Sequence, residues 1–242
     1  MSKHVHFISD LHLTKDRPDI TNGFLAYLSS INNEVSDLYI LGDLFDVWVG
    51  DDDTTEPNLD VKSALQNIVN NGTNTFFIAG NRDFLIGKDF FNETGVICLK
   101  DAHVFDLFGI QTLLMHGDLL CTDDVQYQQF RQLTHTQAWQ NDMLSKPLGE
   151  RLAIAQHYRA ESLKNKAEKS MDIMDVNEQA VINTMLEHDV NQLIHGHTHR
   201  PNIHPIQLNN KTAKRFVLAE WDTCGSVLDF SADGYTINEL TF

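Results

Sequence analysis

The sequence predicts an α/β protein in which two β-sheets are layered between outer helices, with a helical lid inserted into the chain. Three observations predict this fold class. In the first half of the 242-residue chain, short apolar runs typical of strands alternate with segments of helical spacing. Residues 124–187 contain helix formers but no convincing strand, and the chain beyond 192 is rich in β-type runs. Alternating strands and helices favour layered sheets, and one core cannot easily absorb so long a helical stretch between two strands.

The first part of the chain alternates between strand and helix. Apolar or alternating residues predict strands at 4–9, 38–41 and 75–79. Apolar residues at three- and four-residue spacing predict helices at 20–33, 59–69 and 84–94. The second helix is expected to end at Asn70-Asn71-Gly72, because glycine is common just past the last helical turn.

The rest of the chain contains a hairpin, the helical segment and a β-rich end. The hairpin is expected around Phe108-Gly109, with strands at 103–107 and 111–115. Further short strands are expected at 192–195, 215–219, 226–230 and 235–240. We therefore expect residues 1–123 and 188–242 to form the core and residues 124–187 to form the lid over the active site.

Composition is that of an ordinary globular protein, with 42% hydrophobic and 21% charged residues. No run of eighteen apolar residues predicts a membrane span, and the N-terminus lacks the apolar region of a signal peptide, so we expect a cytoplasmic protein. The three cysteines are odd in number and widely spaced, which predicts neither a zinc pattern nor a disulfide framework and fits a reducing compartment.

The charge balance excludes some partners and favours others. A net charge of −16 disfavours nucleic acid, whose phosphates usually need a basic surface. Residues 131–169 are the exception, with seven basic against four acidic residues. This asymmetry favours contact between that segment and an anion or a lipid surface. No obligate protein partner is predicted.

Five expected strands end in residues of the kinds that bind metals. In open α/β sheets, functional residues collect beyond the carboxyl ends of the strands. Residues two apart in an extended segment also face the same side, which pairs the outer residues of an Asp-x-His or His-x-His motif. The motifs are Asp10-Leu11-His12, Gly42-Asp43, Gly80-Asn81, His116 and His197-Thr198-His199.

Each motif alone has an ordinary structural explanation, such as a cap or a solvated loop, but their joint occurrence at strand ends predicts a metal centre. Two Asp, one Asn and four His are too many ligands for one tetrahedral zinc ion. They suit two ions that share one carboxylate, which we assign to Asp43. Mixed imidazole and oxygen donors favour Mn²⁺, Fe or Zn²⁺ over Mg²⁺ or Ca²⁺. Two ions about 3.5–4 Å apart can activate water and clamp a phosphoryl group.

The motif series Asp-x-His, Gly-Asp, Gly-Asn-x-Asp, a single His and Gly-His-x-His resembles that of the calcineurin-like metallophosphoesterases, over the whole chain except the insertion. The resemblance implies a layered α-β-β-α core and catalytic roles for Asp43, Asn81, Arg82 and His116. It also implies two sets of metal ligands that share Asp43. One set would be Asp10, His12, Asp43 and His199, and the other Asp43, Asn81, His116 and His197.

Arg82 departs from many relatives that release alcohols, which have His after the Asn. Arginine cannot act as a general acid at usable pH, but it can grip phosphate oxygens and stabilise growing negative charge. An alkoxide leaving group needs a proton, whereas a phosphate leaving group does not. Arg82 therefore favours cleavage of a pyrophosphate bond. The alternative is a structural ion pair between Arg82 and Asp83.

A finer resemblance rests on five longer segments. They are Leu-Gly-Asp-Leu-Phe-Asp-Val-Trp-Val-Gly-Asp-Asp, Gly-Asn-Arg-Asp-Phe-Leu, Met-His-Gly-Asp-x-Leu-Cys-Thr-Asp-Asp, Ile-Met-Asp-Val-Asn and His-Gly-His-Thr-His-Arg-Pro. They are similar to the branch of the family that acts on a UDP-linked diacyl amino-sugar lipid in lipid A biosynthesis. That branch implies attack of water at the α-phosphorus, UMP and the diacyl sugar 1-phosphate as products, two Mn²⁺ ions, and a peripheral position on the cytoplasmic face of the inner membrane.

The same resemblance implies the substrate contacts. They fall at Asn81, Arg82, Asp124, Arg159, Ser162, Lys166, Lys169 and His197, although Lys166 stands where the branch usually has Asn. The lid could shelter the acyl chains with apolar side chains on its inner face, or these side chains could only pack the lid on the core. The candidates are Phe130, Leu133, Trp139, Leu152, Ile154 and Ala155, with Trp48 and Phe84 from the core loops.

Two other functions remain open at this point. The first is another binuclear metallophosphoesterase that acts on a soluble nucleotide or phosphodiester, against which the apolar lid argues. The second is a non-catalytic scaffold that keeps the fold and binds a protein partner, against which the complete set of seven ligands argues.

Overall fold

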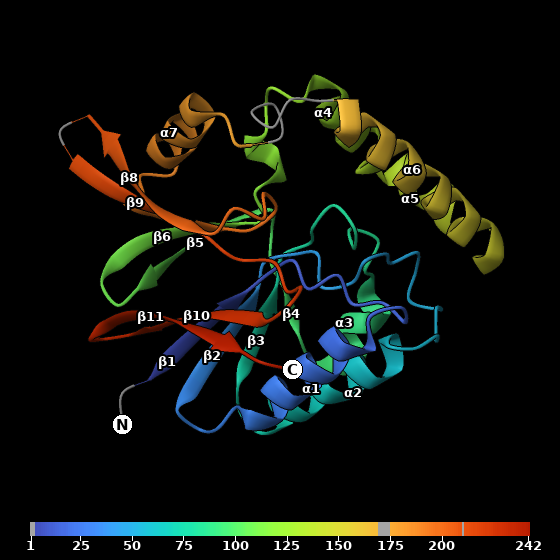
Figure 1. Cartoon of the computed structure of the whole chain (residues 1–242), viewed down its shortest axis with the longest axis horizontal. Helices are drawn as coiled ribbons and strands as arrows, with labels where there is room; N and C mark the ends of the chain where they lie inside the picture. The colour runs from blue at the N-terminus through green and yellow to red at the C-terminus, as the bar shows by residue number, and fades with distance from the viewer. Residues whose placement is uncertain (1–2, 169–174, 210) are drawn as a thin grey trace.

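The computed structural model describes residues 3–168, 175–209 and 211–242; for residues 163–168 it describes the backbone only. Two sheets lie face to face, one with strand order β11-β10-β1-β2-β3-β4 and the other with β5-β6-β7-β9-β8. Helices α1, α2 and α3 cover the outer face of the first sheet and α7 the outer face of the second, while α4, α5 and α6 project to one side (Figure 1). The predicted α-β-β-α fold with a helical insertion is confirmed.

The first sheet is built largely from parallel strands with helical crossovers. Four strands run parallel: β1 (His4–Ile8), β2 (Val35–Ile40), β3 (Asn74–Phe77) and β4 (Ile97–Cys98). At the other side of β1, β10 (Gly225–Ser231) pairs with it antiparallel, and β11 (Gly234–Leu240) pairs antiparallel with β10. The crossovers are α1 (Pro18–Ser30), α2 (Asn58–Asn70) and α3 (Lys88–Thr94). Because the first four strands are parallel, their carboxyl ends meet at one edge of the sheet.

The second sheet is mixed. Strands β6 (Ile110–Met115), β7 (Gln192–His195) and β9 (Lys211–Val217) run parallel, and β5 (Ala102–Leu107) and β8 (Asn202–Leu208) flank them antiparallel. The expected hairpin is confirmed, with Phe108 and Gly109 both at positive φ in its turn. The carboxyl ends of β6 and β7 therefore also lie together, and they lie beside those of the first sheet, since Nδ1 of His116 after β6 is 2.8 Å from the carbonyl oxygen of Leu41 after β2.

Three apolar clusters separate the four layers. One lies between the first sheet and its helices and includes Phe24, Ile40 and Leu65. A second fills the space between the sheets, where Phe7 stacks on Tyr39 with ring centroids 5.2 Å apart. The third lies between the second sheet and α7. Burial on both faces explains why the central strands read as continuous apolar runs in the sequence.

The lid consists of α4 (Val125–Thr134), α5 (Gln137–Leu144) and α6 (Leu148–Glu168). Helix α7 (Glu178–Glu187) also falls within the segment expected to form the insertion, but it packs on the second sheet through Val181 and Met185. No helix in the described parts of the chain is both long and apolar enough to cross a bilayer.

Besides α7 and the short strand β4, which was not predicted, two elements differ from the sequence prediction. Helix α3 begins at Lys88 rather than near residue 84, because residues 83–86 close a turn through an Ile86 N–H to Asp83 carbonyl bond of 3.0 Å. Strand β8 was not expected, because Pro205 interrupts its pattern. Proline is tolerated there because β8 is an edge strand, which needs ladder hydrogen bonds on one side only.

Candidate active site

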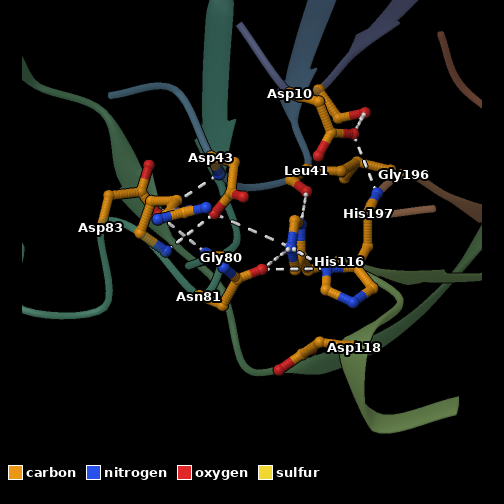
Figure 2. Close-up of polar contacts among 12 residues, drawn as sticks. Asp10, Leu41, Asp43, Gly80, Asn81, Asp83, His116, Asp118, Gly196 and His197 are labelled. Atoms are coloured by element: carbon orange, nitrogen blue, oxygen red, sulfur yellow. Dashed lines mark hydrogen bonds and ion pairs between the residues drawn. The ribbon is translucent and has the colours of Figure 1, made fainter. Parts of the chain in front are cut away.

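The seven expected metal ligands converge where the carboxyl ends of the two sheets meet. Asp10 and His12 follow β1, Asp43 follows β2, and Asn81 follows β3. From the second sheet, His116 follows β6, and His197 and His199 follow β7. Figure 2 shows Asp43, Asn81, His116 and His197 turned toward one another, with Asp10 beside the His197 backbone.

The first group of ligands gathers around the carboxylate of Asp10. The Nε2 atoms of His12 and His199 lie 3.4 Å apart, and His199 Nε2 lies 3.4 Å from Asp10 Oδ1. The other carboxylate oxygen, Oδ2, accepts hydrogen bonds from Ser9 Oγ at 2.6 Å and from the His197 backbone N–H at 2.9 Å. These bonds fix the carboxylate so that Oδ1 points to the two imidazoles.

The second group surrounds the side-chain oxygen of Asn81. Asn81 Oδ1 lies 3.1 Å from His116 Nε2 and 2.9 Å from His197 Nδ1, and these two nitrogens are 3.2 Å apart. His116 Nδ1 lies 2.8 Å from the Leu41 carbonyl oxygen, which orients the ring and leaves Nε2 toward the group (Figure 2).

Asp43 lies between the two groups and offers one oxygen to each. Its Oδ2 is 3.9 Å from His12 Nε2, and its Oδ1 is 3.7 Å from His116 Nε2. Both separations exceed hydrogen-bond length but are compatible with two ligand atoms on a shared cation. This placement is compatible with the bridging role predicted from the sequence, which stays a prediction.

The ligand loops adopt a backbone conformation that L-residues rarely accept. Asp10, His12, Asp43, His197 and His199 all have positive φ, between 50° and 68°. Such conformations are unfavourable for residues with a Cβ and collect at functional sites, where the surrounding structure holds them in place. Here they turn each side chain from the end of its strand toward the common centre.

Two glycines make the close approach of these loops possible. A Cβ on Gly80 would lie 2.2 Å from Asp43 Oδ1, and a Cβ on Gly196 would lie 2.2 Å from Asp10 Oδ2. Any larger residue would displace the carboxylate. The glycines in the Gly-Asn and Gly-His motifs are therefore needed for space beside the ligands.

Burial and mutual charge set the protonation of the site. Burial lowers the pKa values of His12 and His197 to about 3, so both imidazoles are neutral and have lone pairs to share. Burial raises the pKa of Asp43 to about 7. Burial alone would lower the pKa of His116, but the carboxylates of Asp43 and Asp10 raise it to about 9. The buried carboxylates thus attract positive charge into the centre.

These residues fit a divalent cation. Asp10 Oδ1 is fully buried and, within the described residues, makes no hydrogen bond. Burial alone would raise the pKa of this carboxyl, but the imidazoles of His199, His116 and His12 hold it below its usual value. A buried carboxylate oxygen without a donor is costly unless a cation compensates it. Asp10, His12 and His199 form one candidate ligand group, and Asp10, Asp43 and His116 form another.

Asp83 is a functional residue that the sequence analysis treated only as an ion-pair partner for Arg82. Its buried carboxylate accepts hydrogen bonds from the backbone N–H groups of Leu44 at 2.7 Å and Gly80 at 2.8 Å, with a longer contact of 3.3 Å from that of Asp43. One side chain thus fastens two ligand loops together (Figure 2). No ion pair joins it to Arg82 among the described residues, so that alternative is wrong.

Asp118 was also missed, although the His-Gly-Asp motif could have drawn attention to it. Its carboxylate accepts hydrogen bonds of 2.6 Å from both Tyr127 Oη and Arg131 Nε, which belong to α4. The Tyr127 ring in turn lies 5.9 Å from the His197 ring. Asp118, two residues after His116, therefore attaches the start of the lid to the ligand cluster.

A second connection between lid and core involves α6. Arg151 donates to the Val49 carbonyl oxygen at 2.6 Å and pairs with Asp52, and Arg159 pairs with Asp46. These acidic residues lie on the loop that follows Asp43. Two positive charges of the lid are therefore held by that loop, and they fix α6 above the site.

A cavity of about 350 Å³ lies between the ligand cluster and the lid. One part of its wall is polar and includes Asp43, Asn81, Arg82, His197 and His199. The other part is apolar. Its side chains are Trp48, Phe84, Phe130, Trp139, Met143 and Ala155. A single space therefore joins metal-binding chemistry to a hydrophobic wall.

The cavity contains most of the expected substrate contacts. Asp124, Arg159 and Ser162 line it from the lid. Asp124 also caps α4 by accepting a bond from the Tyr127 N–H at 3.1 Å. Lys166 belongs to α6, but its side chain is not among the described ones, and Lys169 lies outside the described residues.

The apolar candidates divide into two groups. Trp48, Phe84, Phe130, Trp139 and Ala155 line the cavity as expected. Leu133, Leu152 and Ile154 do not line it: Leu133 is 57% exposed, and Ile154 packs against the core cluster under the first sheet.

Arg82 lines the cavity and is free to bind an anion. Its Nε is buried and, within the described part of the chain, makes no hydrogen bond. Its own backbone N–H donates to Asp43 Oδ1 at 2.8 Å, which holds the residue beside the ligand cluster. A guanidinium that lines such a cavity and has no ion pair with the described residues suits phosphate oxygens.

The fold and the paired ligand groups define a metallophosphoesterase, and the comparisons with known proteins agree. A family model described as calcineurin-like phosphoesterase matches residues 3–201. The chain is 46% identical over 236 residues to the UDP-2,3-diacylglucosamine hydrolase of Enterobacter sp. (strain 638), with 98% of each chain covered. It is 46% identical to the protein of that name in Serratia proteamaculans (strain 568) and 45% identical to that in Klebsiella pneumoniae subsp. pneumoniae, with the same coverage.

The chain therefore belongs to the calcineurin-like phosphoesterases and, among them, to the family of these UDP-2,3-diacylglucosamine hydrolases. It is an enzyme that requires a divalent metal, for which the structure provides candidate ligand groups.

Replacing Asp83 with asparagine is expected to weaken binding of Mn²⁺ by about 10- to 100-fold, the usual effect of losing a group that orients metal ligands. The asparagine side chain has only one acceptor oxygen. Its NH₂ group, a donor, would face a backbone N–H group that now donates to Asp83, so that hydrogen bond would be lost. Calorimetric titration of Mn²⁺ into chelator-treated protein measures the change.

Asp51→Asn is the matched control. Asp51 also accepts backbone hydrogen bonds, from Gly87, Asp89 and Phe90 at 2.9–3.2 Å, but these belong to the start of α3 and not to a ligand loop. This variant should keep its Mn²⁺ affinity. Equal affinities for the wild type and Asp83→Asn would contradict the positioning role.

Proposed function

We propose that this enzyme hydrolyses the pyrophosphate bond of UDP-2,3-diacylglucosamine. Water attacks the α-phosphorus, and the products are UMP and 2,3-diacylglucosamine 1-phosphate, the lipid A precursor called lipid X. Family membership supports the substrate, since relatives of near-identical length carry its name. The observation that carries the proposal is the cavity, which presents phosphate-binding groups at one wall and apolar lid residues at another.

We propose two Mn²⁺ ions as the metal cofactors, with Fe or Zn²⁺ as possible substitutes. Asp10, His12, Asp43 and His199 would hold one ion, and Asp43, Asn81, His116 and His197 the other. When bound, such a pair lowers the pKa of water and withdraws negative charge from phosphoryl oxygens. The arrangement of Asp43 between two groups of imidazoles supports this division of the ligands.

The residues of the chain itself bind and orient the pyrophosphate. Arg82 lines the cavity and would grip a phosphate oxygen with its guanidinium, which stabilises negative charge as the P–O bond breaks. Asn81 and His197 would hold the α-phosphate next to Arg82. Since the leaving group is a phosphate, no general acid is needed, and Arg82 is suited to the position that histidine occupies in alcohol-releasing relatives.

Residues of the lid would bind the two ends of the lipid. Arg159 and Ser162 face the cavity from α6, where a sugar or phosphate could reach them, with Asp124 at the start of α4. Phe130 and Trp139 would contact acyl chains. A cavity wall of this composition favours the lipid over the soluble alternatives, because long acyl chains bury much more apolar surface against it than a nucleotide does.

The isosteric change Asp43→Asn is expected to lower turnover by at least about a hundredfold, since even residues that only orient a ligand contribute 10- to 100-fold. The asparagine keeps an oxygen for the Arg82 N–H but loses the charge shared between the two ligand groups. Release of UMP from the detergent-solubilised substrate measures turnover, and circular dichroism checks the fold. Near-normal turnover in a correctly folded variant would rule out the two-metal mechanism.

A comparison of two substrates tests the lipid specificity. UDP-2,3-diacylglucosamine is expected to release UMP far faster than UDP-N-acetylglucosamine, which has no long acyl chains. Phe130→Ala should lower kcat/KM on the diacyl substrate about 10- to 100-fold, which corresponds to loss of about 1.5–3 kcal/mol of apolar contact. The matched control is Phe108→Ala, on the exposed hairpin turn. Equal rates of the wild type on both substrates would favour a soluble nucleotide or phosphodiester instead.

We also propose that the protein is cytoplasmic and associates peripherally with the inner membrane, with the lid toward the lipid. Val125, Leu133 and Leu144 are 59%, 57% and 43% exposed on α4 and α5, the two helices that also give Phe130 and Trp139 to the cavity wall. The net charge of −16 opposes contact with anionic lipid. Much of the lid's positive charge is also already paired, with Asp118, Asp52 and Asp46, so the contact must be mainly apolar.

Vesicle sedimentation tests this orientation. Leu133→Ser is expected to reduce the fraction bound to phosphatidylethanolamine–phosphatidylglycerol vesicles by roughly half or more, because the lid loses apolar contact area. Ile237→Ser is the control, since Ile237 is 55% exposed on β11 in the first sheet. A mainly apolar contact should also persist at high salt. If both variants lost the same fraction of vesicle binding, the protein would not bind the membrane through its lid.

A further inference from the structure

A second cluster of metal-type residues lies at the end of β1 far from the active site. His4 and His6 are two residues apart on β1, so their side chains share one face of the sheet. Asp229 on β10 is the antiparallel register partner of His6 and places its carboxylate on that face. The cluster lies where β1 begins, near the N-terminal label in Figure 1, whereas Asp10 and His12 follow the other end of the strand.

The donor atoms of the three residues converge. One candidate ligand atom from each lies within 4.8 Å of the others. His4 Nδ1 lies 2.8 Å from Asp229 Oδ1, while His6 Nε2 lies 3.7 Å from the same oxygen. A separation of 3.7 Å is too long for a hydrogen bond. It is close to the roughly 3.4 Å expected between two ligands of one tetrahedral ion with bonds of about 2.0–2.1 Å.

His6 is oriented as metal-binding histidines usually are. Its Nδ1 lies 2.9 Å from the hydroxyl of the buried Tyr27, which fixes the ring and turns Nε2 to Asp229. Metal-ligating histidines characteristically use their second nitrogen in such a hydrogen bond. Burial lowers the pKa of His6, so the imidazole is neutral, the form that a metal requires.

We propose that His4, His6 and Asp229 bind one divalent transition-metal ion, of which Zn²⁺ is the representative, at a site distinct from the active site. Two imidazoles and a carboxylate are typical zinc donors, whereas Mg²⁺ and Ca²⁺ take mainly oxygen. The His4 side chain is 33% exposed, which gives an ion a path from solvent and leaves a position for water.

The expected role of this ion is structural. His4 and Asp229 are 225 positions apart in the sequence, and a shared ion would fasten the start of the first strand to β10. An ion that binds only the folded protein raises its melting temperature.

Zinc stoichiometry tests the proposal. Chelator-treated full-length protein is titrated with Zn²⁺ by calorimetry, and bound metal is measured after dialysis, for the wild type and for Asp229→Asn. Asparagine preserves shape and a hydrogen-bond acceptor for His4 but removes the charge. We expect the variant to bind one equivalent of Zn²⁺ less and to lose part of the Zn²⁺-dependent rise in Tm. Its turnover with saturating Mn²⁺ should be unchanged, because the three residues lie outside the active site.

His204→Gln is the matched control, since His204 is a half-buried strand histidine outside all candidate ligand groups among the described residues. It should bind as much Zn²⁺ as the wild type. His4→Gln provides a second variant, because the more exposed His4 can be replaced with little effect on folding. If Asp229→Asn and His4→Gln both bind as much Zn²⁺ as the wild type, the cluster is only an ion pair and the proposal is wrong.

Discussion

The buried carboxylate of Asp43 is the constraint on which the rest of the site depends. A carboxylate withdrawn from water must be compensated, and no lysine or arginine forms an ion pair with it among the described residues. The compensation comes from His116, whose pKa the carboxylate raises, from the Arg82 backbone N–H, and from the cations that these ligand groups are suited to bind. Both sheets must therefore contribute ligands, and the sandwich must present the carboxyl ends of two sets of parallel strands at one place.

Asp83 shows how the scaffold maintains that arrangement. Its carboxylate accepts hydrogen bonds from four backbone N–H groups. Three belong to the loop at Asp43, Leu44 and Phe45, and the fourth belongs to Gly80 on the next loop. Backbone in the left-handed region would relax if it were free to do so, and these bonds oppose relaxation. The Asp118 bonds to Tyr127 and Arg131 extend the same control to the lid. The ligand loops and the lid are thus fixed by buried acids that do not themselves contact a metal.

The sequence predicted what is local and periodic. Strand ends followed by Asp, Asn and His could be recognised because each motif spans two or three residues and the strands before them are apolar. The roles of Asp83, Asp118 and Asp52 could not be predicted, because each depends on at least one partner that is distant in the sequence: Leu44, Tyr127 and Arg151 lie 39, 9 and 99 positions away. The attachment of α7 to the second sheet was not foreseen for a related reason: its apolar stripe resembles those of the lid helices, and only the tertiary structure decides which surface it covers.

The distribution of charge explains how an acidic protein can bind an anionic lipid. The excess of basic residues between 131 and 169 first indicated an anion-binding lid, but Arg131, Arg151 and Arg159 all pair with acidic residues of the core. These arginines therefore act mainly as attachments of the lid. Long-range attraction of the substrate is weak in a chain of net charge −16, so the pyrophosphate must be bound by short-range contacts. In the proposed function, Arg82 and the metal ligands would provide these contacts at one wall of the cavity, and the apolar wall would provide affinity that does not depend on charge.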